Sequence, residues 1–292
     1  MKRIRIDERF AGKRLDVFVA ENLTERSRSL SEFLIENGYV KVNGYTVKKG
    51  YPLNRGEEVE FGFEEEELLK VYPDENVKFE VVLKKEDYVI VNKPEGVKTH
   101  PILPFEKGTL LNGIVHKFPT AGELYAKRFE GGLLHRLDND TSGLILCALN
   151  QRSFKRLKNI FRTGSIKKRY YAVVNGILKK GGALSSKIVS PFKGSYRMFV
   201  DPNTEDPEYV TLFEPIKSSR KYTLLDIELI GGKMHQIRAH LSFFGFPILG
   251  DRLYNRDRSF SGRMMLHAYR LTLSGEFDVK TDIPNEFLSI LE

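Results

Sequence analysis

Residues 131–143, GGLLHRLDNDTSG, are the most distinctive stretch of this sequence. Their Asn, Asp, Thr, Ser and Gly residues predict a loop that leads into the apolar run 143–149, GLILCAL, which we expect to be a buried strand. Taken alone, the stretch is typical of a plain turn. Its leucines, however, draw Arg136 and Asp138 towards the edge of the core, where an unpaired charge is costly. We therefore expect both charges to have partners.

A second polar stretch, GGKMHQIRAHL at residues 231–241, follows two glycines and predicts a helix. Its apolar stripe consists of Met234, Ile237, Leu241 and Phe244, and Gly245 would end it. Arg238 flanks this stripe, so it is predicted to lie near the buried face and could pair with a carboxylate. The alternative, an ordinary arginine at the helix boundary, stays open on this pattern alone.

The region around these stretches reads as strands mixed irregularly with few helices. Strands are predicted at 89–91, 144–149 and 166–174, and Asn150 can cap a helix that Gly164 ends. The regular alternation of strand and helix that marks a doubly wound fold is not found. We predict an α+β domain over 77–292 with a mixed, mostly antiparallel sheet.

The first 63 residues form a smaller unit in which each predicted element ends at a turn signal. Ser29 and Glu32 have the spacing of a capping box, Gly38 can end that helix, and Asn43-Gly44 predicts a tight hairpin. We expect a small α-β module of two short helices and a hairpin at 1–63. The acidic residues 64–76 are predicted to be a solvated linker.

Composition narrows the classes of function. The chain has 292 residues, a formal net charge of +8 and one cysteine, Cys147, which excludes a disulfide framework. Its charged N-terminus argues against a signal peptide, and its longest apolar run is far below the ~20 residues that span a bilayer. We expect a cytoplasmic protein without a membrane partner.

The positive charge is concentrated in one segment. Residues 148–180 contain ten Lys and Arg and no Asp or Glu, which predicts either a solvated face or a surface that follows RNA phosphates. Lys155, Lys158 and Lys168 belong to this segment. In the first module the basic candidates are local: Arg26, Arg28, Lys41, Lys48 and Lys49.

Metal and nucleotide chemistry find little support in the sequence. No phosphate-binding loop, nucleophile elbow or zinc motif is present, and His235 and His240, five apart, point to different sides of a helix. We expect neither a metal nor a cofactor.

Five motifs together resemble the RluA-type pseudouridine synthase family, in the same order and at similar spacing. They are HRLDNDTSGL, VNKPEGVKTHP, KKRYYAVVNG, GGKMHQIRAHLSFFGFPILGD and MMLHAYRLTL, and the front segment SRSLSEFLIENGYVKVNG resembles the S4 RNA-binding domain. The resemblance implies isomerisation of uridine to pseudouridine in RNA, without a cofactor. It makes Asp138 the catalytic aspartate, Tyr170 the residue that stacks near the base, Arg238 the cation paired with Asp138, and Arg136 the residue that displaces the nucleotide.

These implied roles agree with simple chemistry. A stacked uracil must be flipped out before its glycosidic bond is accessible, and an arginine beside a buried aspartate favours the charged form. Whether Asp138 attacks C1′, attacks C6 or abstracts a proton stays open. We expect large-subunit ribosomal RNA as the substrate, transfer RNA as the alternative, and a monomer.

Two other functions compete with this interpretation. A glycoside hydrolase would need a second carboxylate near Asp138, and Asp140 is the obvious candidate, although residues two apart in a tight loop tend to diverge. The other competitor is an RNA-binding protein that has lost catalysis.

Overall fold

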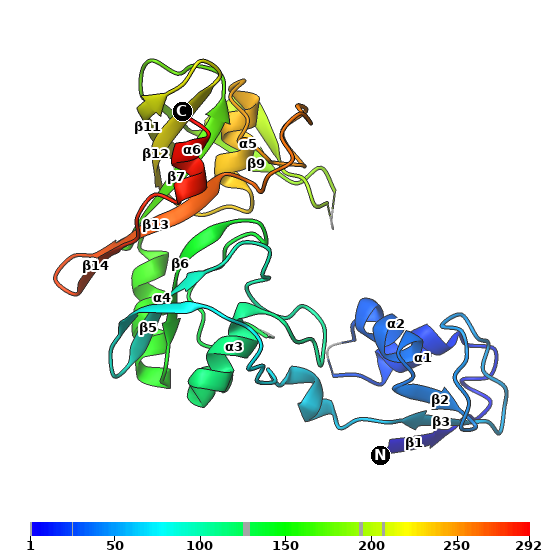
Figure 1. The fold of residues 1–292 in the computed structure, drawn as a ribbon. Helices are drawn as coiled ribbons and strands as arrows, with labels where there is room; N and C mark the ends of the chain where they lie inside the picture. Colours follow the sequence, from blue (N-terminus) through cyan, green and yellow to red (C-terminus); the bar gives the residue numbers. More distant parts are fainter. Residues whose placement is uncertain (1, 25, 125–128, 193–194, 206–207) are drawn as a thin grey trace. The chain divides into compact units, whose positions relative to one another are not determined.

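The computed structural model describes residues 2–24, 26–124, 129–192, 195–205 and 208–292 (Figure 1). The chain divides into two compact units. The first comprises Met1–Tyr72 and the short segment Pro101–Lys107, and the second comprises Pro73–His100 and Gly108–Glu292. The chain thus crosses between the units at residues 72–73, 100–101 and 107–108.

The first unit packs two helices against a three-stranded antiparallel sheet. The helices are α1 (Leu15–Glu21) and α2 (Arg28–Glu36), and the strands run in the order β1 (Lys2–Arg5), β3 (Glu58–Phe61), β2 (Val40–Val42). Phe18, Leu34 and Val59 lie fully buried between the two layers. This burial stabilises a unit whose helices are too short to persist alone.

One local prediction in this unit was wrong, and a second is confirmed only in part. Ser27, not Ser29, caps α2, because its side chain accepts a hydrogen bond from the backbone N of Leu30 at 3.3 Å. The tight turn at Asn43-Gly44 is observed, with reciprocal backbone hydrogen bonds between Val42 and Tyr45 at 2.9 and 3.0 Å, but this pairing stops at a single bridge. Strand β2 finds its sheet partner in the distant β3.

The acidic segment after the first unit is less solvated than predicted. Residues Glu65–Leu69 form a 3-10 helix, η1, and its Leu68 is buried in the core of the first unit. From the 101–107 segment, the ring of Phe105 stacks on Tyr39 at a centroid distance of 4.8 Å. The prediction of a purely solvated linker therefore has to be corrected at Leu68, where an apolar side chain follows the glutamates.

The second unit is built on a nine-stranded sheet. Its order is β4-β5-β6-β13-β7-β12-β11-β8, and β14 pairs with β13. The strands are β4 (Glu80–Lys84), β5 (Tyr88–Lys93), β6 (Ser142–Ala148), β7 (Lys167–Asn175), β8 (Gly182–Leu184), β11 (Thr211–Ser218), β12 (Tyr222–Leu229), β13 (Leu266–Leu273) and β14 (Phe277–Lys280). A separate two-stranded ribbon joins β9 (Ser186–Val189) to β10 (Phe199–Glu205).

Four α-helices accompany this sheet: α3 (Leu110–Lys117), α4 (Gln151–Arg162), α5 (Gln236–Phe243) and α6 (Asn285–Ser289), with a 3-10 turn, η2, at Pro119–Gly122. Helix α4 begins as predicted, because the Asn150 side chain accepts a hydrogen bond from the backbone N of Ser153 at 2.9 Å. Its apolar residues Phe154 and Leu157 are buried against β5 and β6. The stripe predicted for 234–244 was half wrong: Ile237 and Leu241 are buried, whereas Met234 precedes α5 and is exposed.

One pairing in the large sheet is parallel, and it lies at the distinctive loop. Strand β6 begins directly after Asp138–Thr141 and pairs with β13 through His267↔Ser142 and Ala268↔Gly143. Gly143 has φ +123°, and a Cβ there would lie 2.3 Å from the carbonyl oxygen of Ala268, so only glycine fits. All other strand pairs named above are antiparallel, which confirms the predicted α+β class.

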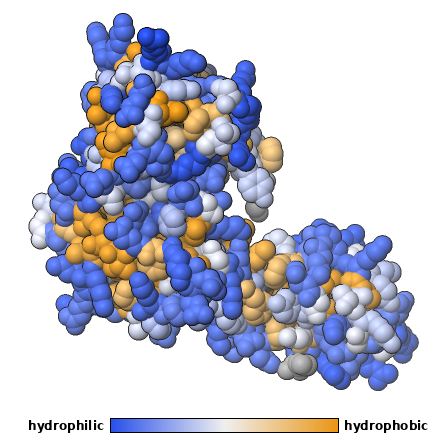
Figure 2. Space-filling model, in the orientation of Figure 1, coloured by the Kyte–Doolittle hydropathy of each residue, from blue (hydrophilic) through white to orange (hydrophobic). Residues whose placement is uncertain are grey.

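The visible surface is mostly hydrophilic. Figure 2 shows blue, hydrophilic residues over much of this view and orange, hydrophobic residues in smaller patches. No helix within the described residues is long and apolar enough to cross a membrane.

Candidate active site

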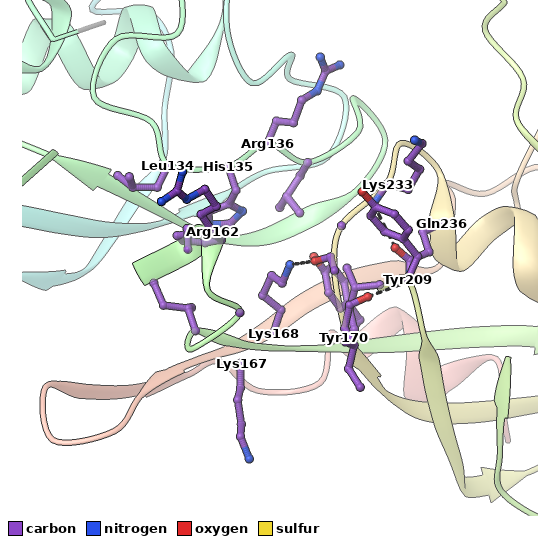
Figure 3. Close-up of a pocket in the computed structure, with 18 of the residues that line it drawn as sticks. Leu134, His135, Arg136, Arg162, Lys167, Lys168, Tyr170, Tyr209, Lys233 and Gln236 are labelled. Carbon is purple, nitrogen blue, oxygen red and sulfur yellow. Dashed lines mark hydrogen bonds between the residues drawn. The ribbon is translucent and has the colours of Figure 1, made fainter. Parts of the chain in front are cut away.

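A pocket of about 1430 Å³ opens in the second unit between the distinctive loop, α4, β7 and the start of α5. Asp138, Tyr170 and Arg238, 32 and 68 residues apart in sequence, all line it (Figure 3 shows Tyr170 among them). The pocket is wide enough to admit a nucleoside, since ligand pockets commonly measure about 300–1,000 Å³.

Arg238 lies at the centre of an ion-paired triad. Its Nη1 donates to Asp138 Oδ2 at 2.7 Å, and its Nε and Nη2 donate to Asp251 Oδ2 and Oδ1 at 2.7 and 2.9 Å. The side chain of Asp251 is fully buried, that of Arg238 is 9% exposed, and that of Asp138 is 23% exposed. The triad thus fixes one aspartate in the interior and presents the other to the pocket.

The electrostatics of the triad are consistent with that arrangement. Burial lowers the pKa of Arg238, but its hydrogen bonds to Asp251 and the charge of Asp138 outweigh burial and raise the pKa overall. For Asp251 burial raises the pKa, and the contacts with Arg238 and the backbone N–H groups of Leu253 and Tyr254 bring it below its ordinary value. Arg238 therefore stays a cation that can hold a carboxylate in the pocket.

The Asp138 loop is held in place by the last residue of β5 and by the segment that follows this strand. Lys93 is fully buried, and its Nζ donates to three carbonyl oxygens, including that of Asn139 at 2.9 Å. Thr99 bonds both the carbonyl and the amide of Leu137, at 2.6 and 3.2 Å. Burial lowers the pKa of Lys93 to about 8 against the opposing charges of Asp140 and Asp138. These contacts hold the backbone of the loop, so the position of the Asp138 carboxylate does not depend on the stiffness of the loop alone.

Two polar atoms of the loop are open to a ligand. Within the described residues, no hydrogen bond reaches Asp138 Oδ1, since Arg238 bonds only Oδ2. The hydroxyl of Thr141, a pocket residue that is 2% exposed, is buried without any partner in the described part of the chain. An unsatisfied buried hydroxyl is costly and calls for a partner, which a bound substrate can supply.

Tyr170 lies in the middle of the sheet, where β7 pairs with β12 on one side and β13 on the other. The side chain is 6% exposed and still lines the pocket. Burial, and then the charge of Asp138, raises the pKa of Tyr170, so the phenol stays neutral at physiological pH. A flat neutral ring close to a carboxylate suits contact with a base.

Three of the lysines predicted to bind RNA line this pocket, in two different settings. Lys155 and Lys158 lie on α4 at the pocket wall. Lys168 lies inside: its Nζ bonds the carbonyl oxygen of Gly231, and burial lowers its pKa to about 8 (Figure 3). Figure 3 also shows Lys167 and Lys168 on opposite sides of β7, as strand alternation requires. Lys168 is therefore part of the pocket interior and not of the outer α4 surface.

Arg136 and Asp140, which lie two residues before and after Asp138 in the loop, are both exposed. Arg136 is exposed at the pocket rim, and in the described structure it has no ion pair, so the expectation of a partner was wrong for Arg136. Its side chain is exposed to solvent instead. Asp140 is exposed and is not among the residues that line the pocket.

The basic residues of the first unit that were predicted to bind RNA differ in whether a carboxylate already pairs with them. Arg28 bonds Asp16 at 3.1 Å, and Lys49 bonds Glu32 at 2.8 Å and Glu36 at 3.0 Å. Lys48 is exposed, and no carboxylate of the described chain pairs with it.

Sequence reasoning missed Lys93, Thr141 and Asp251 as parts of the site. All three stand inside motifs named above, VNKPEGVKTHP, HRLDNDTSGL and FPILGD, but nothing in their spacing shows a contact across the fold. No group of three or more His, Cys, Asp or Glu suited to a metal ion occurs among the described residues.

Comparison with known proteins gives the class. The family model for RNA pseudouridylate synthase matches residues 87–243, and the model for the S4 domain matches residues 13–59. The fold resembles the solved structure of human RNA pseudouridylate synthase domain containing 1, with a TM-score of 0.59 and 24% identity over 75% of this chain and 89% of that one.

Sequence relatives agree with this class. The ribosomal large subunit pseudouridine synthase D of Haemophilus ducreyi is 31% identical over 301 residues, which cover 96% of this chain and 90% of that protein. An uncharacterized RNA pseudouridine synthase of Aquifex aeolicus is 34% identical over 246 residues, covering 83% and 77%. The chain belongs to the RNA pseudouridine synthase family and carries an S4 domain in its first unit, as the motifs predicted.

Proposed function

We propose that this enzyme isomerises uridine to pseudouridine in large-subunit ribosomal RNA, with Asp138 as the catalytic aspartate. The observation that carries the proposal is the Asp138 carboxylate in the pocket: Arg238 holds Oδ2 at 2.7 Å, and Oδ1 has no hydrogen bond within the described residues. Oδ1 is thus the oxygen directed to the substrate, whether it bonds to carbon or takes a proton.

Tyr170, Arg136 and Lys168 supply the contacts that hold a flipped nucleotide in this proposal. Tyr170 offers the face on which the uracil stacks, a contact worth about 1–3 kcal/mol per base. Arg136, exposed at the rim, enters the RNA helix in place of the extruded base, which costs a few kcal/mol to flip. Lys168, inside the pocket, places its ammonium where a phosphate or sugar oxygen of that nucleotide would lie.

The surrounding RNA is held by the basic surface of α4 and by the S4 domain. Lys155 and Lys158 stand at the pocket wall and neutralise phosphates beside the target. The large ribosomal subunit as the source of the RNA is supported by the name of the Haemophilus ducreyi relative, while transfer RNA is the alternative. A monomer in the cytoplasm and the boundaries 1–63, 64–76 and 77–292 complete the proposal.

The test measures tritium release from 5-tritiated uridine in a transcript of large-subunit ribosomal RNA. We expect Asp138→Asn to abolish release while retaining RNA binding in a filter assay, because the carboxylate is lost and the pocket wall is kept. Asp140→Asn is the matched control, since Asp140 is exposed two residues away and outside the pocket.

The same pair of variants separates the competing functions. A glycoside hydrolase that uses Asp140 would lose activity in Asp140→Asn and would release free uracil from the wild-type reaction. A pure binding protein would release no tritium in any variant. Tritium release by Asp138→Asn would disprove the proposed role of Asp138.

The target uridine is found by mapping pseudouridines in total RNA from cells with and without this enzyme. We expect the missing sites in large-subunit ribosomal RNA. Missing sites confined to transfer RNA would reassign the substrate and leave the mechanism intact.

A further inference from the structure

His235 lies against the carboxylate of Asp138 and is a residue that the proposed chemistry does not use. Its Nε2 is 3.6 Å from Asp138 Oδ2, and its side chain is 13% exposed. The residue precedes α5 with φ 58° and ψ 20°, a left-handed conformation that is uncommon for a residue with a side chain. Such a conformation persists where surrounding contacts determine it, and these contacts reach both ring nitrogens of His235.

The contacts of Tyr254 decide which nitrogen of His235 carries the proton. The hydroxyl of Tyr254 accepts a hydrogen bond from the backbone N of Met198 at 2.7 Å and lies 3.1 Å from His235 Nδ1. A phenol has one proton to donate, and the backbone N–H of Met198 cannot accept it. Among the described residues, His235 Nδ1 is the one acceptor for that proton, so Nδ1 is unprotonated.

The other end of the ring requires the same tautomer. With Nδ1 unprotonated, a neutral imidazole carries its proton on Nε2, and this N–H faces the negative charge of Asp138. The opposite tautomer would direct a lone pair of Nε2 at that carboxylate and leave the Tyr254 proton without an acceptor. Both contacts therefore favour the Nε2–H form.

We propose that His235 is a positioning residue for Asp138, kept as a neutral Nε2–H imidazole by the hydroxyl of Tyr254. The neutral ring restrains Oδ2 without adding a full positive charge. This leaves Arg238 as the cation paired with the carboxylate, and Oδ1 keeps its reactivity towards the substrate. The inference rests on the proposed role of Asp138.

The charges that face His235 support a neutral ring. Burial is the largest influence and lowers its pKa; Asp138 and Asp251 oppose this, whereas Arg238 and Arg136 reinforce it. A second cation beside Arg238 would compete for Oδ2 and would weaken the carboxylate as a base or nucleophile. The hydrogen bond from the Tyr254 hydroxyl to His235 Nδ1, which we call the lock, adds to the effect of burial on the protonation of the ring. The hydroxyl occupies the nitrogen that would otherwise accept a proton.

Tyr254 itself is fixed by two arginines from different parts of the unit. The guanidinium carbon of Arg197 lies 5.3 Å from the ring centroid, and that of Arg238 lies 5.1 Å from it. Arg197 and Met198 directly precede β10, so the lock joins that ribbon to the catalytic carboxylate. Movement of the ribbon would shift the Tyr254 hydroxyl and thereby the proton on His235.

The first experiment reads the tautomer in the wild-type protein by nitrogen NMR. The chain has six histidines, and His235→Gln identifies the signal of His235 by its disappearance. We expect one protonated nitrogen, Nε2, and no titration between pH 7 and pH 5.5. A proton on Nδ1, or a titration midpoint near pH 6.5, would overturn the inference. This readout does not involve activity, so it stands apart from any failure of Asp138 as the catalytic group.

The second experiment compares pH profiles of kcat for tritium release from the large-subunit ribosomal RNA transcript. In Tyr254→Phe the lock is absent while the burial of the ring remains, so the pKa of His235 rises towards its ordinary ~6.5 and kcat falls from pH 7 to pH 5.5, by about eightfold where the shift is complete. The wild type changes less than about twofold over that range. The double variant Tyr254→Phe/His235→Gln restores the flat profile, because glutamine donates from its amide and does not titrate. A Tyr254→Phe profile that matches the wild type, or a double variant that keeps the acidic loss, would refute the lock.

Discussion

Each unit of this enzyme contains one buried charge held between two opposite charges, and the two clusters are inverted in sign. In the S4 domain the buried residue is Asp16, and the exposed partners are Arg14 and Arg28, 52% and 62% exposed. In the catalytic unit the buried cation is Arg238, and its partners are the interior Asp251 and the pocket residue Asp138. The same pairing chemistry thus presents cations to solvent in one unit and a carboxylate to a pocket in the other.

This difference matches what each unit has to bind. RNA presents phosphates, which attract exposed guanidinium groups. A reaction at a glycosidic bond needs a carboxylate with one oxygen open, and a buried arginine is the group that can hold the other oxygen without losing its own proton. The buried member fixes the geometry in both clusters, and we expect the exposed member to meet the ligand.

The largest effect is expected from Arg238→Gln. The change leaves Asp251 buried without its cation, which costs about 3–5 kcal/mol of unfolding free energy, and releases Asp138. We expect kcat to fall at least hundredfold, since displacement of a catalytic group by about 1 Å has that effect. Urea unfolding followed by tritium release measures both. An active and stable Arg238→Gln protein would mean that Arg238 is needed neither to hold Asp138 nor to compensate the charge of Asp251.

Asp16→Asn tests the inverted cluster and should cost less. The change leaves two exposed arginines, which water can solvate, so we expect a loss of about 1–3 kcal/mol confined to the S4 domain. Hydrogen exchange of the amides in α1 and α2 measures it. A loss of unfolding free energy as large as that of Arg238→Gln would show that exposure of the partner residues does not reduce the cost of leaving them unpaired.

The Asp16 cluster also predicts a pH dependence. The hydrogen bond from Arg14, followed by that from Arg28, lowers the pKa of Asp16 to about 2 against the effect of burial. A lowered pKa gives stability that is complete above the ordinary value near 4 and is lost as the pH falls towards 2. The difference in S4-domain stability between wild type and Asp16→Asn should therefore shrink between pH 4 and pH 2 and vanish below pH 2. A difference that stays constant from pH 4 to pH 2 would contradict the ion pairing.

Thr141→Val changes the pocket cluster without altering charge. Valine keeps the shape and removes the buried hydroxyl, so we expect kcat/KM to fall about three- to tenfold with little change in unfolding free energy. Steady-state tritium release measures it, and Ser153→Ala on α4, whose hydroxyl already has backbone partners, serves as the control. Unchanged kcat/KM would show that the Thr141 hydroxyl meets no substrate atom.

The smallest effect separates two adjacent lysines of the S4 domain. Lys48→Ala should reduce the slope of log affinity against log salt by about 1, the value for one phosphate contact. Lys49→Ala should change the slope less, because Lys49 is already paired with Glu32 and Glu36. Equal slopes for the two variants would remove the distinction between paired and unpaired cations.

Much of this structure could be predicted from local patterns. The strand of 144–149, the cap at Asn150 and the mostly antiparallel sheet depend on neighbouring residues, and they are observed. The turn at Asn43-Gly44 is also observed, but its pairing ends after one bridge, and the sheet partner of β2 is β3, some 15 residues later in the chain. A local turn signal predicts the turn and not the strand that a distant segment supplies.

The sequence motifs predicted the residues that line the pocket, but not the buried residues that support them. The sequence brought Asp138, Tyr170 and Arg238 together as candidates, and all three line one pocket, although their roles stay predictions. The buried supports Lys93 and Asp251 were missed, because a charge that is neutralised inside the fold looks in sequence like any other charge. A partner was wrongly predicted for Arg136, because the leucines beside it suggested burial. Its own side chain is exposed.

The parallel pair of β6 and β13 has a consequence in time. Ser142, at the end of the Asp138 loop, bonds His267 of β13 at 2.7 Å across a sequence separation of 125 residues. At about 5–20 residues per second of synthesis, the loop leaves the ribosome some 6–25 s before the strand that anchors it. The S4 domain and the segment 101–107 that completes it emerge earlier still. During translation this protein has the means to hold RNA before it has the means to modify it.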